Sequence, residues 1–292
     1  MSNISKMKSS QLREVLPVVE ECCRKLDIDF YIIGALAREI WFSGVGLLTG
    51  GTRDIDLALF VSDENQFDQL KGLLIEDQGF HKAKENAFVL FAPNGTQIDI
   101  LPFGSLEVED GVVVPSKGLT KIKVNGFKEV YLKSVTEVRV LEERTYKIAT
   151  LSGIFLLKLV AFDDRPEQRA KDAGDCMTII EHFFDLQSDL IWENHNDLFD
   201  SDRSLQQIGS RVIGREMRRP LLENTQLMGR VIAILENHIR LREQSQFVQL
   251  MAEMSEDNYY DEGESEGDFE LTIEDCVSYL AEILSGIREV SK

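Results

Sequence analysis

The spacing of apolar residues predicts that strands and helices mix in the first half of the chain. Apolar positions three to four residues apart over residues 11–26 predict an amphipathic helix, and the apolar run at 30–33 predicts a short strand. Gly34 follows this run and residues 35–42 have a helical composition, so we expect a strand, a tight turn and a helix in succession. Residues 54–61 predict a half-exposed strand, and residues 64–75 predict a helix that Ser62 would cap.

Short β-prone runs continue to residue 131. Residues 87–92 and 97–101 predict the two strands of a hairpin, because the turn signal Pro93-Asn94-Gly95 lies between them. Gly and Pro interrupt three further runs, at 112–114, 121–124 and 127–131, and we expect small additional strands there. Four glycines predict a flexible loop over residues 44–51.

After residue 150 the pattern becomes helical. Five helices are predicted, at residues 154–162, 167–184, 205–213, 224–241 and 273–288. The stretch 255–268 is rich in Gly, Ser and acidic residues, which predicts a mobile linker before the last helix. We therefore predict an α+β fold with a mixed sheet flanked by helices in a first domain at residues 1–149, followed by a helical domain at residues 150–292.

Composition indicates a folded, water-soluble protein, with 43% hydrophobic and 28% charged residues. The four cysteines lack metal-ligand spacing, so reduced thiols are the simplest interpretation. The amino terminus lacks the apolar core of a signal peptide, and no run of eighteen apolar residues occurs. We expect a cytoplasmic protein.

The formal net charge of -19 argues against broad nucleic-acid binding, because proteins that grip phosphates usually carry a basic surface. The charge is unevenly spread: residues 253–270 hold no Lys or Arg, whereas residues 203–242 are basic. Arg211, Arg215, Arg218 and Arg219 recur at about one helical turn. They indicate either a basic patch for RNA or a partner, or a solvated helix face.

Three acidic residues carry the candidate chemistry. Asp54 and Asp56 stand at i and i+2 on a predicted strand, so both carboxylates face the same way and can converge on a hard cation. Asp99, on a neighbouring strand, can supply a third carboxylate if its register matches. Such a cluster suits phosphoryl or nucleotidyl transfer, and Gly34 would let backbone amides approach a phosphate. Alternatively, Asp-x-Asp is common on solvated strands, and a strand-to-helix turn often uses Gly for its φ alone.

The order of these features over residues 30–101 resembles the nucleotidyltransferase superfamily: a strand ending in a small-residue turn, a helix, Asp-x-Asp on a strand, and a third acid. The strings at 32–40 and 52–58 are similar to the AbiEii-type branch, which is associated with abortive infection and toxin–antitoxin systems. A second match follows in Leu157-Lys158-Leu159 and Arg165, then Lys171-Asp172 and Asp175. It is similar to the family's lysine-containing helix and its Lys-Asp-x-x-Asp helix.

The resemblance implies a metal-dependent enzyme that transfers a nucleoside monophosphate from an NTP to an acceptor hydroxyl. Asp54, Asp56 and Asp99 would bind Mg2+ or Mn2+, and Asp99 would help to activate the nucleophile. Lys158 would contact triphosphate oxygens. The resemblance implies the 3′ end of a tRNA as the acceptor, as in toxin members, whereas a protein or small-molecule acceptor would fit the acidic net charge equally well. A cognate antitoxin or operon partner is expected. The residues assigned to nucleotide binding are Gly34, Ala35, Arg38, Arg53, Lys158, Arg165, Lys171 and Asp172.

Several points stay open in the sequence. Lys158 lies in an otherwise apolar helix, so its ammonium group needs a partner, and a bound phosphate is one candidate. Alternatively, the side chain snorkels to water at the edge of the helix. Lys171 and Asp172 fit a solvated face as well as a pocket. Ala35 stands where the family has Gly or Ser, and the loop before Asp54 is longer than in compact members. The competing hypothesis is a catalytically degenerate protein that keeps the fold to bind a protein partner; an uncompensated acidic cluster argues against it.

Overall fold

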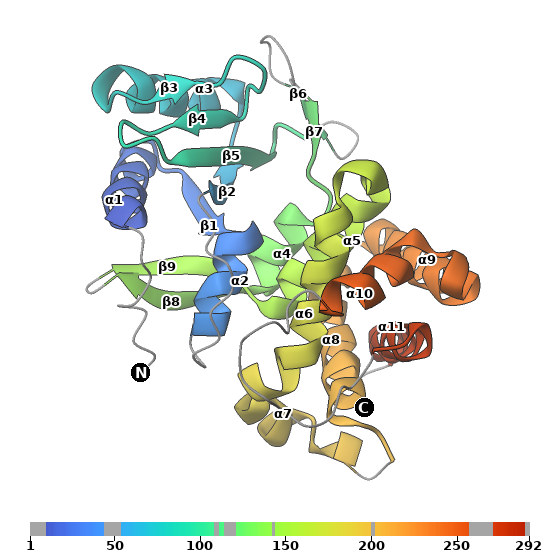
Figure 1. The fold of residues 1–292 in the computed structure, drawn as a ribbon. Helices are drawn as coiled ribbons and strands as arrows, with labels where there is room; N and C mark the ends of the chain where they lie inside the picture. The colour runs from blue at the N-terminus through green and yellow to red at the C-terminus, as the bar shows by residue number, and fades with distance from the viewer. Residues whose placement is uncertain are drawn as a thin grey trace. The chain divides into compact units, whose positions relative to one another are not determined.

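The computed structural model describes residues 10–43, 54–107, 111–113, 121–141, 144–199, 202–256 and 271–289. The chain divides into two compact units, Met1–Thr150 and Leu151–Lys292. The first is built of strands and helices and the second of helices (Figure 1). The predicted loop at 44–51, Arg53 and most of the acidic stretch 255–268 lie outside the described residues.

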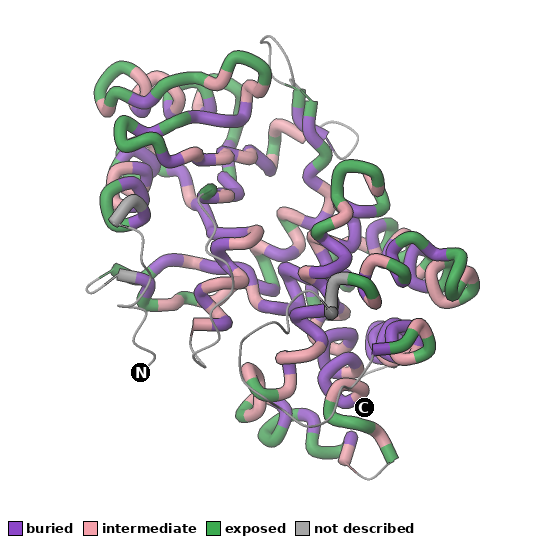
Figure 2. Tube along the Cα trace, viewed as in Figure 1, coloured by how far each residue is buried: buried purple, intermediate pink, exposed green. Residues whose placement is uncertain are grey.

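A seven-stranded mixed sheet forms the first unit, in the order β3-β4-β5-β2-β1-β9-β8. Neighbouring strands are antiparallel except for the pairs β2–β5 and β1–β9, which are parallel. Its strands are β1 Asp29–Ile32, β2 Asp54–Val61, β3 His81–Lys82, β4 Val89–Phe91, β5 Gln97–Gly104, β8 Val135–Leu141 and β9 Arg144–Ala149. A separate two-stranded sheet pairs β6 Gly111–Val113 with β7 Lys121–Lys123. Edge strand β3 is exposed, whereas the more central β1 is mostly buried (Figure 2).

Helices pack against this sheet. They are α1 Ser10–Lys25, α2 Gly34–Ser43, α3 Glu64–Gly72 with its π-helical extension Leu73–Asp77, and α4 Phe127–Lys133. The predicted order of helix, strand, turn, helix and strand up to residue 61 is confirmed, and so is the β4–β5 hairpin.

Two local predictions in this unit are wrong. Asp63, not Ser62, caps α3, because its side chain accepts a hydrogen bond from the Gln66 amide at 2.8 Å. The run 127–131 is helix α4 rather than a strand, because Phe127 and Tyr131 at i and i+4 both pack on Phe103 of the sheet. Strands β8 and β9 were not predicted at all.

The second unit contains seven α-helices among its described residues. They are α5 Leu151–Asp164, α6 Ala170–Leu186, α7 Ser188–Asn194, α8 Leu205–Leu221, α9 Thr225–Leu241, α10 Gln246–Glu256 and α11 Ile273–Arg288. The five predicted helices are confirmed, although α8 runs on through Pro220, and α7 and α10 are additional. Helices α8 and α11 pack closely, and α6 contacts α5, α8 and α10.

All four cysteines are buried and free of disulfides, as expected for reduced thiols. In the part of the chain that the structure describes, no helix has the length and apolar character needed to span a bilayer.

Candidate functional site

The three acidic residues lie on one face of the sheet. Strands β2 and β5 are parallel and in register, so that Asp56 lies opposite Asp99 and Asp54 opposite Gln97. Residues paired across neighbouring strands point to the same face, and so do residues two apart on one strand. The register therefore meets the condition that the sequence left open: the carboxylates of Asp54, Asp56 and Asp99 project from the same face.

This face changes character along the strands. Asp54 is exposed, and Asp56 and Asp99 are half-buried. Further along the same strands, Phe60 and Phe103 lie 5.5 Å apart and pack against Tyr131 of α4. The acids thus occupy the accessible end of a face whose other end is filled by aromatic rings.

The Gly34 turn places backbone directly beside Asp56. Gly34 follows β1, opens α2 and has φ +65°, which L side chains rarely adopt. A Cβ at this position would lie 2.2 Å from Asp56 Oδ2, well inside contact distance. The amide of Ile33 donates to the Asp56 carbonyl at 3.0 Å and fixes the turn against β2. Glycine is therefore required both by the backbone angle and by the approach of a carboxylate.

The donor set suits a hard divalent cation. Gln97 Nε2 donates to Asp99 Oδ1 at 2.8 Å and orients that carboxylate. In this structure, no three His, Cys, Asp or Glu side chains of the described residues are gathered closely enough to hold a metal ion. Mg2+ is commonly held by one or two carboxylates together with substrate phosphates rather than by an all-protein cage. Carboxylates on one open face, beside a glycine turn, match that mode of binding.

In the second unit, Lys158 is held by two carboxylates. Its Nζ lies 2.7 Å from Asp172 Oδ1 and 2.5 Å from Asp175 Oδ2, joining α5 to α6. The side chain of Lys158 is 11% exposed, so it does not snorkel to the solvent. The partner that its apolar helix requires is thus supplied by the protein. Asp175 received no role from the sequence, although its i+3 spacing from Asp172 places both acids on one helix face.

The other predicted nucleotide-binding residues differ in their exposure. Lys171 is exposed whereas its neighbour Asp172 is buried, so these two residues do not act as one surface pair. Arg165 is half-buried between α5 and a short 3-10 helix. Ala35 and Arg38 lie in the first turns of α2, both half-buried.

The arginines of α8 are bonded within the second unit. Arg211 pairs with Glu282 at 2.6 Å and with Glu289 at 2.7 Å. Arg215 pairs with Glu289 at 2.5 Å and with Asp197 at 2.6 Å, and its hydrogen bond to Asp197 raises the pKa of Arg215. The other two arginines bond to the Ile287 carbonyl (Arg218) and to Glu216 (Arg219). Arg211, Arg215 and Arg218 therefore serve as counter-ions or anchors within the unit, whereas Arg219 is largely exposed beside Glu216.

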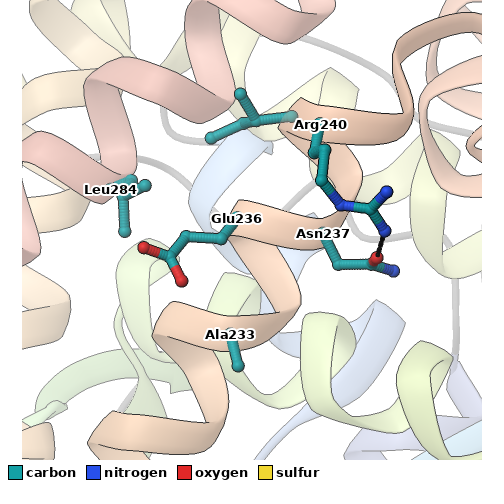
Figure 3. Close-up of a pocket in the computed structure, with 6 residues that line it drawn as sticks. Ala233, Glu236, Asn237, Arg240 and Leu284 are labelled. Atoms are coloured by element: carbon teal, nitrogen blue, oxygen red, sulfur yellow. Dashed lines mark hydrogen bonds between the residues drawn. The ribbon is translucent and has the colours of Figure 1, made fainter.

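An open hollow of about 510 Å3 lies on α9 and α11 (Figure 3). Its polar groups are already engaged: Arg240 donates to Asn237 Oδ1 at 2.7 Å, and Glu236 pairs with Arg288. The lining residues are Ala233, Glu236, Asn237, Ile239, Arg240 and Leu284. This hollow contains none of the predicted site residues.

Three solved structures are distantly similar to the chain. The antibiotic-resistance factor ANT(2'')-Ia is 12% identical in its solution structure, with TM-score 0.36, covering 63% of this chain and 93% of that one. Its crystal structure with adenylyl-2''-tobramycin is 13% identical, with TM-score 0.39 and coverage of 65% and 95%. An antigenic nucleotidyltransferase-like protein from Paracoccidioides brasiliensis is 15% identical, with TM-score 0.37 and coverage of 63% and 89%.

No curated protein matches the sequence significantly. A family model does match, and it is described as the nucleotidyl transferase AbiEii toxin of type IV toxin–antitoxin systems. The match runs over residues 51–273, more than half of the chain, and includes Asp54, Asp56, Asp99 and Lys158. The chain belongs to the AbiEii family of nucleotidyl transferase toxins.

Proposed function

We propose that this protein is a Mg2+- or Mn2+-dependent enzyme that transfers a nucleoside monophosphate from an NTP to an acceptor hydroxyl. The observation that carries the proposal is the common face of Asp54, Asp56 and Asp99, with the Gly34 backbone against Asp56. The catalytic domain would be residues 1–149, and the helical domain, residues 150–292, would contribute to nucleotide binding and to the choice of acceptor.

Within the first domain, Asp54 and Asp56 would hold the metal, and Asp99, oriented by Gln97, would act as a ligand or as the base for the attacking hydroxyl. The bound cation would neutralise phosphate charge and lower the pKa of that hydroxyl. Gly34 has no side chain of its own, so the amides at the start of α2 would be able to approach the triphosphate beside the Asp56 carboxylate. Ala35 offers no hydroxyl, so backbone amides must make this contact, with Arg38 and Arg53 as further cationic groups.

In the second domain, Lys158 is the strongest candidate for a phosphate contact. An ammonium group has three N–H donors, and Asp172 and Asp175 take two of them among the described residues. The third remains to donate to a phosphate oxygen, while the two carboxylates fix the Nζ in place. Arg165 and Lys171 would add positive charge around the nucleotide.

The 3′ end of a tRNA is the acceptor to test first, with a protein acceptor tested beside it. Family membership also points to a cognate antitoxin as partner. A direct assay incubates the protein with each labelled NTP, Mg2+ or Mn2+, and either total tRNA or a cell lysate. We expect the wild type to transfer label to RNA or protein and Asp56→Ala to transfer none.

Two variants separate chemistry from stability. Gly34→Ala should abolish transfer, because its Cβ displaces the Asp56 carboxylate or the turn. Asp77→Ala, which removes an exposed carboxylate from the same unit, should retain full activity.

A thermal shift adds a binding readout: NTP with Mg2+ at 100-fold above Kd should stabilise the wild type by about 2.7 kcal/mol, and Asp54→Ala should lose that response. Absence of both transfer and stabilisation with every NTP and metal would favour the degenerate binding protein.

A further inference from the structure

An exposed aromatic stack lies on the second unit, outside the proposed site. Trp192 of α7 stacks on Phe199 with ring centroids 4.0 Å apart and planes 2° from parallel (Figure 1 shows α7). Phe199 in turn meets Phe184 edge-on at 6.1 Å. Trp192 nevertheless remains 55% exposed. Because Phe199 covers one face of the indole, the exposure belongs to the other face and the ring edges.

The stack is held rigidly from below. Ile191 and Leu198, which neighbour the two stacked residues in sequence, are 0% and 3% exposed. Both short helical segments are thereby anchored in the core, and the indole keeps its orientation without a ligand. Tryptophan is one of the residue types enriched at the energetic centres of binding interfaces, and Trp192 faces the solvent.

The surroundings of Trp192 are acidic. Residues 172–202 contain nine Asp or Glu and no Lys or Arg. Asp189, one helical turn before Trp192, and Glu193, next to it, are both exposed. Neither forms an ion pair with any Lys or Arg that the structure describes, whereas Asp197 is neutralised by Arg215. Trp192 therefore lies among exposed carboxylates that no described Lys or Arg neutralises, and Asp189, three residues before it, is its neighbour on the helix surface.

We propose that Trp192, Asp189 and Glu193 form a docking site for a Lys/Arg-rich segment of a partner protein. A cation above the indole face would gain cation–π attraction, and the carboxylates beside it would supply ion pairs. The occupant follows from charge complementarity. A nucleic-acid strand also stacks on tryptophan, but its phosphates would meet repulsion from these acids rather than the positive groove that such sites use.

The test measures the binding of a fluorescein-labelled hexa-arginine peptide by fluorescence anisotropy. The assay uses about 0.15 M salt, at which interactions between exposed charges more than about 8 Å apart are largely screened. Trp192→Leu keeps an apolar side chain but removes the π face, and it should weaken binding about 2- to 30-fold. Trp192→Phe keeps an aromatic face and should bind within about threefold of the wild type. Asp189→Asn/Glu193→Gln should weaken binding like Trp192→Leu.

A matched control removes the same charge elsewhere. Glu76 and Asp77 are exposed at the end of the π-helix in the first unit, so Glu76→Gln/Asp77→Asn changes the net charge by the same two units. This control should bind the peptide like the wild type. Three results would each overturn the proposal. Trp192→Leu could bind the peptide as tightly as the wild type, the two double variants could lose the same affinity, or a single-stranded RNA could displace the peptide. Melting temperatures verify the fold, and the charge variants decide the question if Trp192→Leu is unstable.

Discussion

The crossing of α8 and α11 depends on two glycines that allow backbone to touch backbone. A Cβ at Gly214 would lie 2.1 Å from the Ile283 carbonyl oxygen, and a Cβ at Gly286 would lie 2.3 Å from that of Arg211. Ordinary contacts of this kind begin near 3.4 Å. The two helices would therefore have to separate by about 1 Å, because a backbone carbonyl cannot rotate out of the way as a side chain can.

We predict that Gly286→Ala destabilises the second unit by about 1–2 kcal/mol. Overpacking typically costs about 1–3 kcal/mol, and the higher helix propensity of alanine returns up to about 1 kcal/mol. Gly229 on α9 supplies the matched control, since no atom lies within 4 Å of its Cβ position. Gly229→Ala should raise stability by about 0.5–1 kcal/mol from the same propensity term.

Tryptophan fluorescence can follow this unit alone. The chain has two tryptophans, Trp41 in the first unit and Trp192 in the second, so a Trp41→Phe background leaves one reporter. Urea unfolding should show a lower midpoint for Gly286→Ala and a higher one for Gly229→Ala, with similar slopes. Equal midpoints for the two variants would show that the helices separate freely and would refute the close-crossing argument.

Two further changes have defined outcomes. Lys158→Met should lower the free energy of unfolding by about 3–5 kcal/mol, because it removes the ammonium group that the buried Asp172 and the half-buried Asp175 share. Adding Asp172→Asn and Asp175→Asn should restore most of the stability but not NTP binding, and thermal shifts with and without NTP measure both. Burial lowers the pKa of His238 in the folded protein. Above the unfolded pKa of about 6.5 the imidazole is neutral in both states and stability is unaffected. As the pH falls from there towards the lower folded pKa, the unfolded chain binds the proton first and the folded protein loses stability. His238→Gln should flatten this acid-side decline by up to about 1.4 kcal/mol per pH unit, whereas His81→Gln, at an exposed position, should leave the denaturation profile unchanged.

The central strands and the acidic face could be predicted because their signals are local. Asp54 and Asp56 alternate with buried Ile55 and Leu57, so the pattern alone fixes which face each residue takes. The partner of Asp56 depends on the parallel pairing of β2 with β5, whose residues are more than forty positions apart. Periodicity cannot specify such a register, and only the fold brings Asp99 opposite Asp56.

Two errors show where tertiary packing decides. Phe127 and Tyr131 are β-prone residues, yet Gly126 at φ +91° redirects the chain and the i, i+4 pair then packs on the sheet as a helix. Buried and less buried residues alternate in the first part of strand β9, where Tyr146 and Ile148 are buried. This short pattern predicts a strand only weakly, and the strand is fixed by the parallel pairing of Ile148 with Ile32 of β1. The local pattern is compatible with several structures until a distant strand provides the partner.

Internal ion pairs also change how the charge of the second unit should be interpreted. The sequence allowed the arginines of α8 to form either a basic patch or a solvated helix face, but Arg211 is only 12% exposed and is neutralised by Glu282 and Glu289. Arg215 is neutralised by Asp197 and Glu289. Arg211 and Arg215 therefore add no free positive charge to the surface, although Arg219 remains 59% exposed beside Glu216. Asp189 and Glu193 add free negative charge. An RNA acceptor would gain no attraction from Arg211 or Arg215, so other residues would have to bind its phosphates. A basic protein segment, by contrast, would be attracted by the exposed acids of α7.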